Sequence, residues 1–285
     1  MDLNSSQIAD IILKIFDLHI LTLALMLGYL CWNRELFGRA IALALFSMIE
    51  NPALKAIWKI PLPESVSSHG WAFPSGHMQL LICLMGVLFI GIPSKIIRMF
   101  FVLAAVFVAI AIRYKGYHNA FDLAGGAFFG ILTVAAFYWM YTRPFFAKNQ
   151  SLVPWALVAI SVPLLYILSV WDPTIHHYHS HGAFGGLVAL GTGWWLMRDV
   201  RPAESIFGRV VVGAMGAFLM VYLVPGMINE VPSFLRLTDG EVIFTTRCVS
   251  GYVVPLLVVT VVVPAVFTAF RLLAKQCLTK RKKSH

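Results

Sequence analysis

Two short polar stretches stand out in a chain that is otherwise 59% hydrophobic. The first, HGWAFPSGHMQ, places Ser75, Gly76 and His77 directly before a long apolar run. The free N–H groups at the start of a helix, together with a serine hydroxyl and a flexible glycine, form a favourable seat for an anion. Pro74 suits the first turn of such a helix. This stretch therefore predicts an anion site, with His77 one turn into the helix and facing the same point.

The second stretch, RYKGYHNAFDLAGG, contains His118 and Asp122, which are four residues apart. On a helix, residues at this spacing share a face and can touch. A carboxylate that holds one imidazole nitrogen fixes the tautomer and makes the other nitrogen a better nucleophile or base. One such pair is weak evidence alone. With a second histidine in an anion-binding stretch, it predicts acid–base or nucleophilic chemistry on a bound anion.

Apolar helices must position these residues, because only 12% of the chain is charged. A soluble protein has about twice that share, and a helix needs roughly 20 apolar residues to cross a bilayer. The sequence therefore predicts an all-α, polytopic integral membrane helical bundle with about nine transmembrane helices. The expected spans lie near residues 11–32, 36–57, 74–93, 97–113, 119–141, 153–171, 182–197, 207–229 and 249–273. Polar residues make the first half of span 11–32 a candidate amphipathic segment, and glycines in span 182–197 suit close helix packing.

The net charge of +9 reflects membrane orientation and does not indicate nucleic-acid binding. About two thirds of the Lys and Arg residues fall on one set of loops and on the basic tail at 274–285, which the positive-inside rule places in the cytoplasm. Nine spans then put the N-terminus outside. The loops that carry Ser75 and His118 face outside as well, at the lipid boundary. The polar, acidic first residues predict no cleavable signal peptide.

Taken together, the PSGH stretch and the HxxxD pair resemble the type 2 phosphatidic acid phosphatase superfamily, a family of membrane lipid phosphate phosphatases. Its signature has three parts: KxxxxxxRP, PSGH and SRxxxxxHxxxD. The PSGH part matches in full, the third part keeps His118 and Asp122, and the first part would begin at Lys55. The resemblance covers roughly residues 36–140.

The chain departs from this pattern at both signature arginines. Leu62 and Ile112 occupy their places, while Lys59 and Arg113 lie close by. An arginine binds phosphate through a planar two-pronged contact that a lysine does not reproduce. A slip of one residue turns Arg113 by about 100° on a helix, which an irregular turn can absorb. We expect Lys59 and Arg113 to substitute in part for the missing arginines.

The resemblance implies a role for each matching residue. His118 is expected to attack phosphorus and form a phosphohistidine, with Asp122 orienting it, and His77 is expected to protonate the leaving oxygen. The residues expected to hold the phosphoryl oxygens are Lys55, Ser75, Gly76, Arg113 and Lys59. Positive charge and helix N–H groups would stabilise the phosphoryl oxygens, so no metal and no other cofactor is implied.

The expected activity is hydrolysis of a lipid phosphate or polyprenyl diphosphate, with the lipid bilayer as the other partner. Two alternatives stay open: a phosphotransferase that moves phosphate from lipid to lipid, and a non-catalytic lipid-binding or transport member. The missing arginines and the additional helices favour the latter. We expect an integral, multi-pass protein of a bacterial inner membrane with a periplasm-facing site, or of the endoplasmic reticulum in a eukaryote. The oligomeric state does not follow from the sequence.

The chain divides into four expected parts: an N-terminal helix at 1–35, a phosphatase-like catalytic core at 36–142, additional transmembrane helices of unknown role at 150–273, and the tail at 274–285. Two other polar features have competing interpretations. The stretch HHYHSH at 176–181 has a spacing that could bind zinc or copper, but a plain loop is favoured. Glu50 and Asn51, late in the second span, are expected either to support Lys55 or to be an ordinary charged helix end.

Overall fold

The computed structural model describes residues 4–62, 70–172, 177–197, 206–219 and 240–269, together with residues 228, 232 and 235. Within these ranges the chain is helical apart from short connections, and an isolated bridge between Pro61 and Trp71 is the only extended pairing. The predicted all-α class is therefore confirmed for the described part of the chain. The expected tail at 274–285 and His176 lie outside it.

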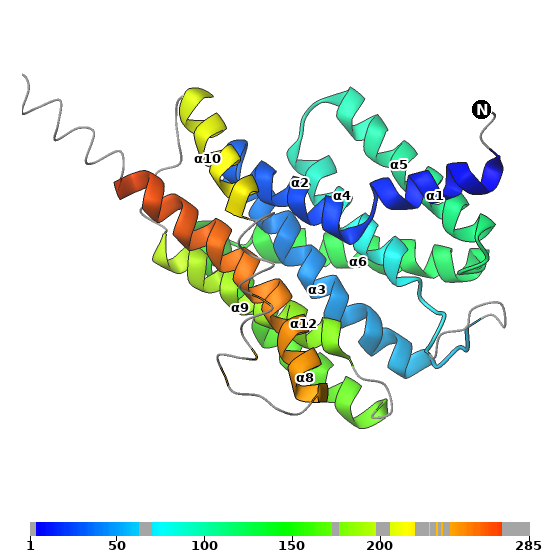
Figure 1. Cartoon of the computed structure of the whole chain (residues 1–285). Coiled ribbons are helices and arrows are strands. Elements are labelled where there is room, and N and C mark those ends of the chain that lie inside the picture. Colours follow the sequence, from blue (N-terminus) through cyan, green and yellow to red (C-terminus); the bar gives the residue numbers. More distant parts are fainter. Residues whose placement is uncertain are drawn as a thin grey trace, which may run out of the picture.

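Figure 1 shows the order and arrangement of the helices. They are α1 (Ser5–Ile15), α2 (Leu18–Cys31), α3 (Arg34–Trp58), α4 (Gly76–Gly91), α5 (Lys95–Tyr114), α6 (Ala120–Tyr141), α7 (Pro144–Lys148), α8 (Val153–Trp171), α9 (Tyr178–Leu196), α10 (Ile206–Phe218) and α12 (Gly240–Leu257), with the short turns η1 (Gln150–Leu152) and η3 (Val258–Val262). Polar caps fix several starts: the side chains of Asn33, Ser94 and Asn119 accept N–H groups from the first turns of α3, α5 and α6.

The lengths and apolar compositions of these helices indicate a multi-pass membrane protein. Among the described residues, six stretches are long and apolar enough to cross a membrane: Ser5–Cys31, Arg34–Trp58, Lys95–Tyr114, Ala120–Tyr141, Gln150–Trp171 and Thr245–Ala269. Gly76–Gly91 is a shorter apolar helix. The first expected span is divided into α1 and α2 at Phe16 and Asp17, as its polar leading half suggests. The count of nine spans and the orientation stay predictions.

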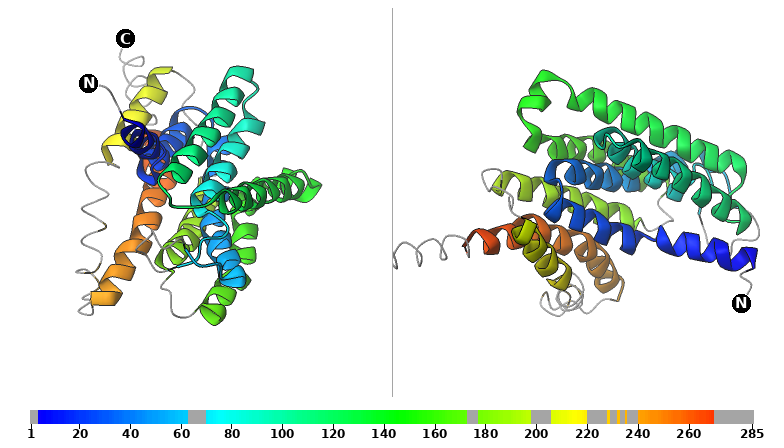
Figure 2. Two further views of the ribbon diagram at one scale, coloured as in Figure 1. Left: turned by 90° about the vertical axis from the view of Figure 1, so that its right-hand side faces the viewer. Right: turned by 90° about the horizontal axis from the view of Figure 1, so that it is seen from above.

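Helix α3 lies at the centre of the bundle and packs against α2, α4, α8 and α9. Its side chains Ala40, Leu43 and Ile49 are completely buried. Figure 2 shows α4 and α5 on one side of the bundle and α12 on the other. Because α3 contacts helices from both halves of the sequence, any group near its end is held by the whole bundle.

Small residues allow the helices to approach closely. A Cβ atom on Gly130 of α6 would lie 2.8 Å from Ile82 of α4, and one on Gly86 of α4 would lie 2.8 Å from Val134 of α6. Helix α9 is held in the same way, because a Cβ atom on Gly186 would lie 3.1 Å from the side chain of Leu256 in α12. Glycine-rich faces are typical of closely packed membrane helices, so the packing role predicted for this span is confirmed.

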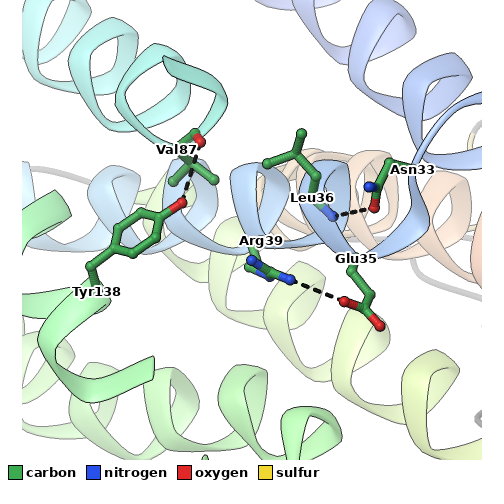
Figure 3. A network of polar contacts seen from close by, with 6 residues as sticks. All are labelled: Asn33, Glu35, Leu36, Arg39, Val87 and Tyr138. Carbon is green, nitrogen blue, oxygen red and sulfur yellow. Dashed lines mark hydrogen bonds and ion pairs between the residues drawn. The ribbon is translucent and has the colours of Figure 1, made fainter. Parts of the chain in front are cut away.

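Figure 3 shows polar contacts at one end of the bundle. There the Arg39 guanidinium donates to Glu35 Oε2 at 3.0 Å, and the Tyr138 hydroxyl donates to the Val87 carbonyl at 3.4 Å. This end carries the start of α3 and the ends of α4 and α6. The expected site residues lie at the other end of these helices, which is called the site end below.

Candidate active site

The PSGH turn, residues 74–77, leads into α4 at the site end. Ser75 is the N-cap, with φ −63° and ψ 117°, and the helix begins at Gly76, so Pro74 precedes the cap instead of lying in the first helical turn. The Ser75 hydroxyl does not cap the helix, although it is completely buried, and it has no hydrogen-bond partner among the described residues. This hydroxyl and the first N–H groups of α4 are therefore available to an anion.

His118 and Asp122 meet at the start of α6. The helix begins at Ala120 with Asn119 as N-cap, and Asn119 and Asp122 form a reciprocal capping box. His118 comes just before the cap, so it meets Asp122 around the helix terminus, whereas the sequence predicts contact across one helical face. Its Nδ1 lies 3.6 Å from Asp122 Oδ2, slightly beyond hydrogen-bond range. Catalytic hydrogen bonds often tighten only when substrate binds.

The two helix starts are joined directly. The Ser75 N–H donates to the Asp122 carbonyl at 3.0 Å. A Cβ atom on Gly126 would lie 2.5 Å from the Ser75 carbonyl oxygen, and one on Gly125 would lie 2.1 Å from the Phe73 ring. These two α6 positions therefore require glycine, because a side chain there would push the PSGH turn away from Asp122.

Lys55 lies in the last turn of α3 and supplies positive charge to the same place. It is half-buried, and its ammonium group interacts electrostatically with Asp122, His77 and His118. Burial of the imidazole and the Lys55 charge lower the pKa of His118 from 6.5 to about 4, although Asp122 opposes the shift. The imidazole is therefore neutral near pH 7, as a nucleophile must be.

The two basic residues expected to replace the missing arginines both have exposed side chains. Lys59 ends α3 in a left-handed conformation with φ 50°, and its side chain is exposed. Arg113 is exposed in the last turn of α5. Neither side chain makes a hydrogen bond or ion pair with any part of the chain that the structure describes. Their role in holding phosphate stays a prediction.

Three residues that are not among the predicted catalytic and phosphate-binding residues lie against the site. Asp17, at the break between α1 and α2, interacts electrostatically with His77. Asn51 Nδ2 donates to the Pro74 carbonyl at 3.1 Å, and Gln79 bonds to Asn51. For Asn51 and Gln79 the sequence signal is a polar side chain within an apolar helix, which indicates a functional or supporting position but does not identify its partner.

The plain loop favoured for the histidine-rich stretch is wrong for residues 178–181, because α9 begins at Tyr178. The described part of the stretch has polar partners within the protein. His179 Nδ1 lies 2.9 Å from the Tyr252 hydroxyl, His181 Nδ1 lies 3.0 Å from the His177 carbonyl, and the Ser180 hydroxyl donates to the Met48 carbonyl at 3.0 Å. Within the described ranges, no three His, Cys, Asp or Glu side chains gather closely enough to hold a metal ion.

The arrangement at the site end suits attack on a phosphorylated group. Nδ1 of His118 faces Asp122, so a nucleophilic role for this histidine would use Nε2. Lys55, the Ser75 hydroxyl and the start of α4 supply positive charge and hydrogen-bond donors for phosphoryl oxygens.

Comparison with known proteins adds one match. Residues 40–146 match the family model described as the PAP2 superfamily. The matched segment contains Lys55, the PSGH turn, His118 and Asp122. No curated protein and no solved structure matches the chain.

Proposed function

We propose that the chain is a member of the PAP2 superfamily, whose family model matches residues 40–146, and that it is a membrane phosphatase that hydrolyses a lipid phosphate or polyprenyl diphosphate through a phosphohistidine at His118. Membership itself indicates phosphatase-type activity on phosphorylated substrates. The observation that carries the finer proposal is the grouping of His118, Asp122 and Lys55 beside a buried Ser75 hydroxyl without a protein partner.

In the first step, the Nε2 lone pair of His118 forms a bond to phosphorus while the bond from phosphorus to the lipid oxygen breaks. The proton on Nδ1 stays toward Asp122, whose carboxylate stabilises the positive charge that develops on the ring. His77 gives its proton to the departing lipid oxygen, so the lipid leaves as a neutral alcohol when the substrate is a monoester. General acid help of this kind contributes about 10²–10⁴ in rate.

In the second step, water attacks phosphorus and the phosphorus–nitrogen bond breaks. His77, now neutral, takes a proton from the water, and the electron pair returns to His118. Inorganic phosphate is released and both histidines regain their starting protonation states. Asp122 is fully buried and held by the Asn119 N–H at 3.0 Å, so its carboxylate needs no rearrangement between the two steps.

The phosphoryl oxygens carry negative charge throughout, and Lys55 with the start of α4 would oppose it. Ser75 adds a hydroxyl donor whose oxygen is already desolvated. Preorganised donors in a buried site do not have to reorient during the reaction, which is the main advantage they have over water.

Exposed aromatic side chains around the site end support a lipid substrate. Trp58, Tyr114, Tyr117 and Phe121 each expose about half or more of their surface, at 53%, 57%, 48% and 64%. Aromatic residues of this kind gather at the membrane–water interface. A phosphorylated headgroup would reach His118 from this level while its acyl or prenyl chains stay in the bilayer.

The test is phosphate release from phosphatidic acid presented in detergent. We expect the wild type to release free phosphate, and His118→Ala and His77→Ala each to abolish release, while His181→Ala keeps it. Retained release in both site variants contradicts the proposal. Recovery of the phosphate on an added lipid alcohol, with none released free, would instead establish the transferase.

A further inference from the structure

A chain of buried polar side chains runs beneath the PSGH turn and connects three helices. Glu50 Oε2 accepts from Gln79 Nε2 at 2.8 Å and from the Thr133 hydroxyl at 2.6 Å. Asn51 Nδ2 donates to Gln79 Oε1 at 2.8 Å. Asn51, Gln79 and Thr133 expose 6%, 0% and 5% of their surface. Glu50 and Asn51 belong to α3, Gln79 to α4 and Thr133 to α6, so the chain, called the Glu50 network below, joins all three.

The Glu50 network ends on the backbone of the PSGH turn. The amide nitrogen of Asn51 also donates to the Pro74 carbonyl at 3.1 Å. From the other side, α6 holds the next peptide group, because the Ser75 N–H donates to the Asp122 carbonyl. The Asn51 Oδ1 atom lies where a Cβ atom on Gly76 would approach it to 2.8 Å. The turn is therefore clamped between α3 and α6, and neither of its polar backbone groups at Pro74 and Ser75 is left unsatisfied.

The composition of the Glu50 network argues for a specific role. An acidic side chain in an apolar helix is costly, and it persists where other groups satisfy it. Glu50 receives one donor from each neighbouring helix, and hydrogen bonds between membrane helices contribute little to stability. An apolar interface would hold the helices together equally well. What the polar chain adds is direction, because Gln79 orients the Asn51 amide so that its N–H groups face Gln79 and Pro74.

We propose that Asn51 is a positioning residue that the Glu50 network orients, and that it sets the PSGH turn so that the Ser75 hydroxyl and the first N–H groups of α4 point at the phosphoryl group. This inference rests on the proposed phosphatase function. Asn51 touches no substrate and acts through Pro74. The sequence left two interpretations of Glu50 and Asn51 open, support of Lys55 or an ordinary charged helix end, but their hydrogen bonds lead to the turn instead.

Asn51→Asp tests the role with a nearly unchanged shape. The variant replaces the donor with an oxygen that faces two acceptors, Pro74 O and Gln79 Oε1. A misplacement of about 1 Å costs roughly 10²-fold in rate, so we expect kcat for phosphatidic acid to fall about 100-fold and KM to change much less. Ser161→Ala is the matched control, because it also removes a buried side-chain hydrogen bond, to Leu157 in α8, away from the turn.

Exchanging the residue types at positions 50 and 79 should rescue the kcat that each single variant loses. Gln79→Glu alone places two carboxyl groups against each other, and Glu50→Gln alone removes the charge that accepts from Gln79 and Thr133. The double variant Glu50→Gln, Gln79→Glu restores an amide donor to a carboxylate acceptor and leaves an acceptor for Asn51. We expect each single variant to lose at least tenfold in kcat and the double variant to recover most of it. A double variant as impaired as the product of the singles would overturn the network.

Amide hydrogen exchange separates this inference from the proposed function. The Ser75 N–H is bonded to Asp122 and the Gln79 N–H to Ser75. We expect Asn51→Asp to speed exchange at both amides and Ser161→Ala to leave both unchanged. Unchanged exchange in Asn51→Asp overturns the positioning role whether or not the wild type releases phosphate. Faster exchange, in a wild-type background that never releases phosphate, supports the clamp on the turn and rejects the proposed function.

Discussion

Two histidine-bearing junctions lie side by side at the site end. The PSGH turn leads into α4, and His177 precedes α9, whose first turns contain His179, Ser180 and His181. The two are joined by Trp71, whose Nε1–H donates to Asp172 Oδ2 at 2.8 Å. Both combine histidine, serine and glycine at the start of an apolar helix.

The polar groups of the two junctions differ in whether they have hydrogen-bond partners within the protein. At the start of α9, His179, Ser180 and His181 each have a protein partner. At the start of α4, the Ser75 hydroxyl is buried without a hydrogen bond, and Asp122 Oδ1 nearby is also unpartnered. Unpaired buried groups cost free energy and persist in native proteins where a function uses them. Partners, rather than residue types, distinguish a candidate active site from a structural junction.

The largest expected difference in kcat is between two variants that each lack one histidine, His118 beside the α4 junction and His179 in the α9 junction. We expect His118→Asn to lower kcat about 10⁴-fold, because it removes the nucleophile, and His179→Asn to stay within about threefold because only its hydrogen bond to Tyr252 is lost. Initial rates of phosphate release measure both. Equal losses in the two variants would erase the distinction between the junctions.

Adding a methyl group beside the α4 junction should have the next largest effect. Gly126→Ala places Cβ 2.5 Å from the Ser75 carbonyl oxygen, whereas nothing lies within 4 Å of a Cβ atom on Gly251 in α12. We expect Gly126→Ala to reduce kcat about 100-fold and stability by about 1–3 kcal/mol. Gly251→Ala should keep activity and gain up to about 1 kcal/mol. Thermal unfolding in detergent and kcat report the two effects; a fully active Gly126→Ala argues against a fixed turn.

The pKa of His118 in the folded protein gives a third test, because it should lie well below the pKa of the same histidine in the unfolded chain. A histidine in an unfolded chain has a pKa near 6.5, and burial with the Lys55 charge lowers the pKa of His118 to about 4. Diethyl pyrocarbonate modifies only neutral imidazole, so modification of His118 should persist down to about pH 4 in the folded protein and fail below about pH 6.5 in the unfolded one. Lys55→Met should move the folded midpoint upward. Peptide mapping by mass spectrometry follows the site, and coincident midpoints would contradict the electrostatic environment.

The smallest expected effect concerns the bond between the junctions. Trp71→Phe removes the N–H donor to the buried Asp172 carboxylate, which costs about 1–3 kcal/mol of stability. Activity should fall only a few-fold, because Trp71 acts through the loop and not on the phosphoryl group. Trp171→Phe, at an exposed neighbouring position, is the control. A loss in Trp71→Phe as large as that of His118→Asn would place Trp71 among the site residues.

The sequence predicted the helical class and the close approach of Ser75, His118 and Asp122 because these features depend on composition and on short, fixed spacings. It placed the His118–Asp122 contact on a helical face, and the structure forms it around a helix terminus, because Asn119 takes the cap. Local spacing does not distinguish these two routes to one contact.

The sequence pattern did not predict contacts between helices that are far apart in the sequence. Asn51 and Pro74 are 23 residues apart, and Glu50 and Thr133 are 83 apart. A polar residue in an apolar helix indicates that a partner exists, but only the packing of α3, α4 and α6 identifies it. The positions of Lys59 and Arg113 likewise follow from how α3 and α5 end, which the motif count alone did not determine.

Capture of the phosphoenzyme tests the proposed chemistry at its first step. The wild type is mixed with phosphatidic acid that carries radioactive phosphate, denatured within milliseconds in alkaline detergent, where phosphohistidine survives, and mapped by proteolysis. We expect the label on the peptide that contains His118 and its absence from His118→Asn. Label on another residue such as Ser75, or hydrolysis by the wild type with no labelled protein at any time, would contradict nucleophilic attack by His118.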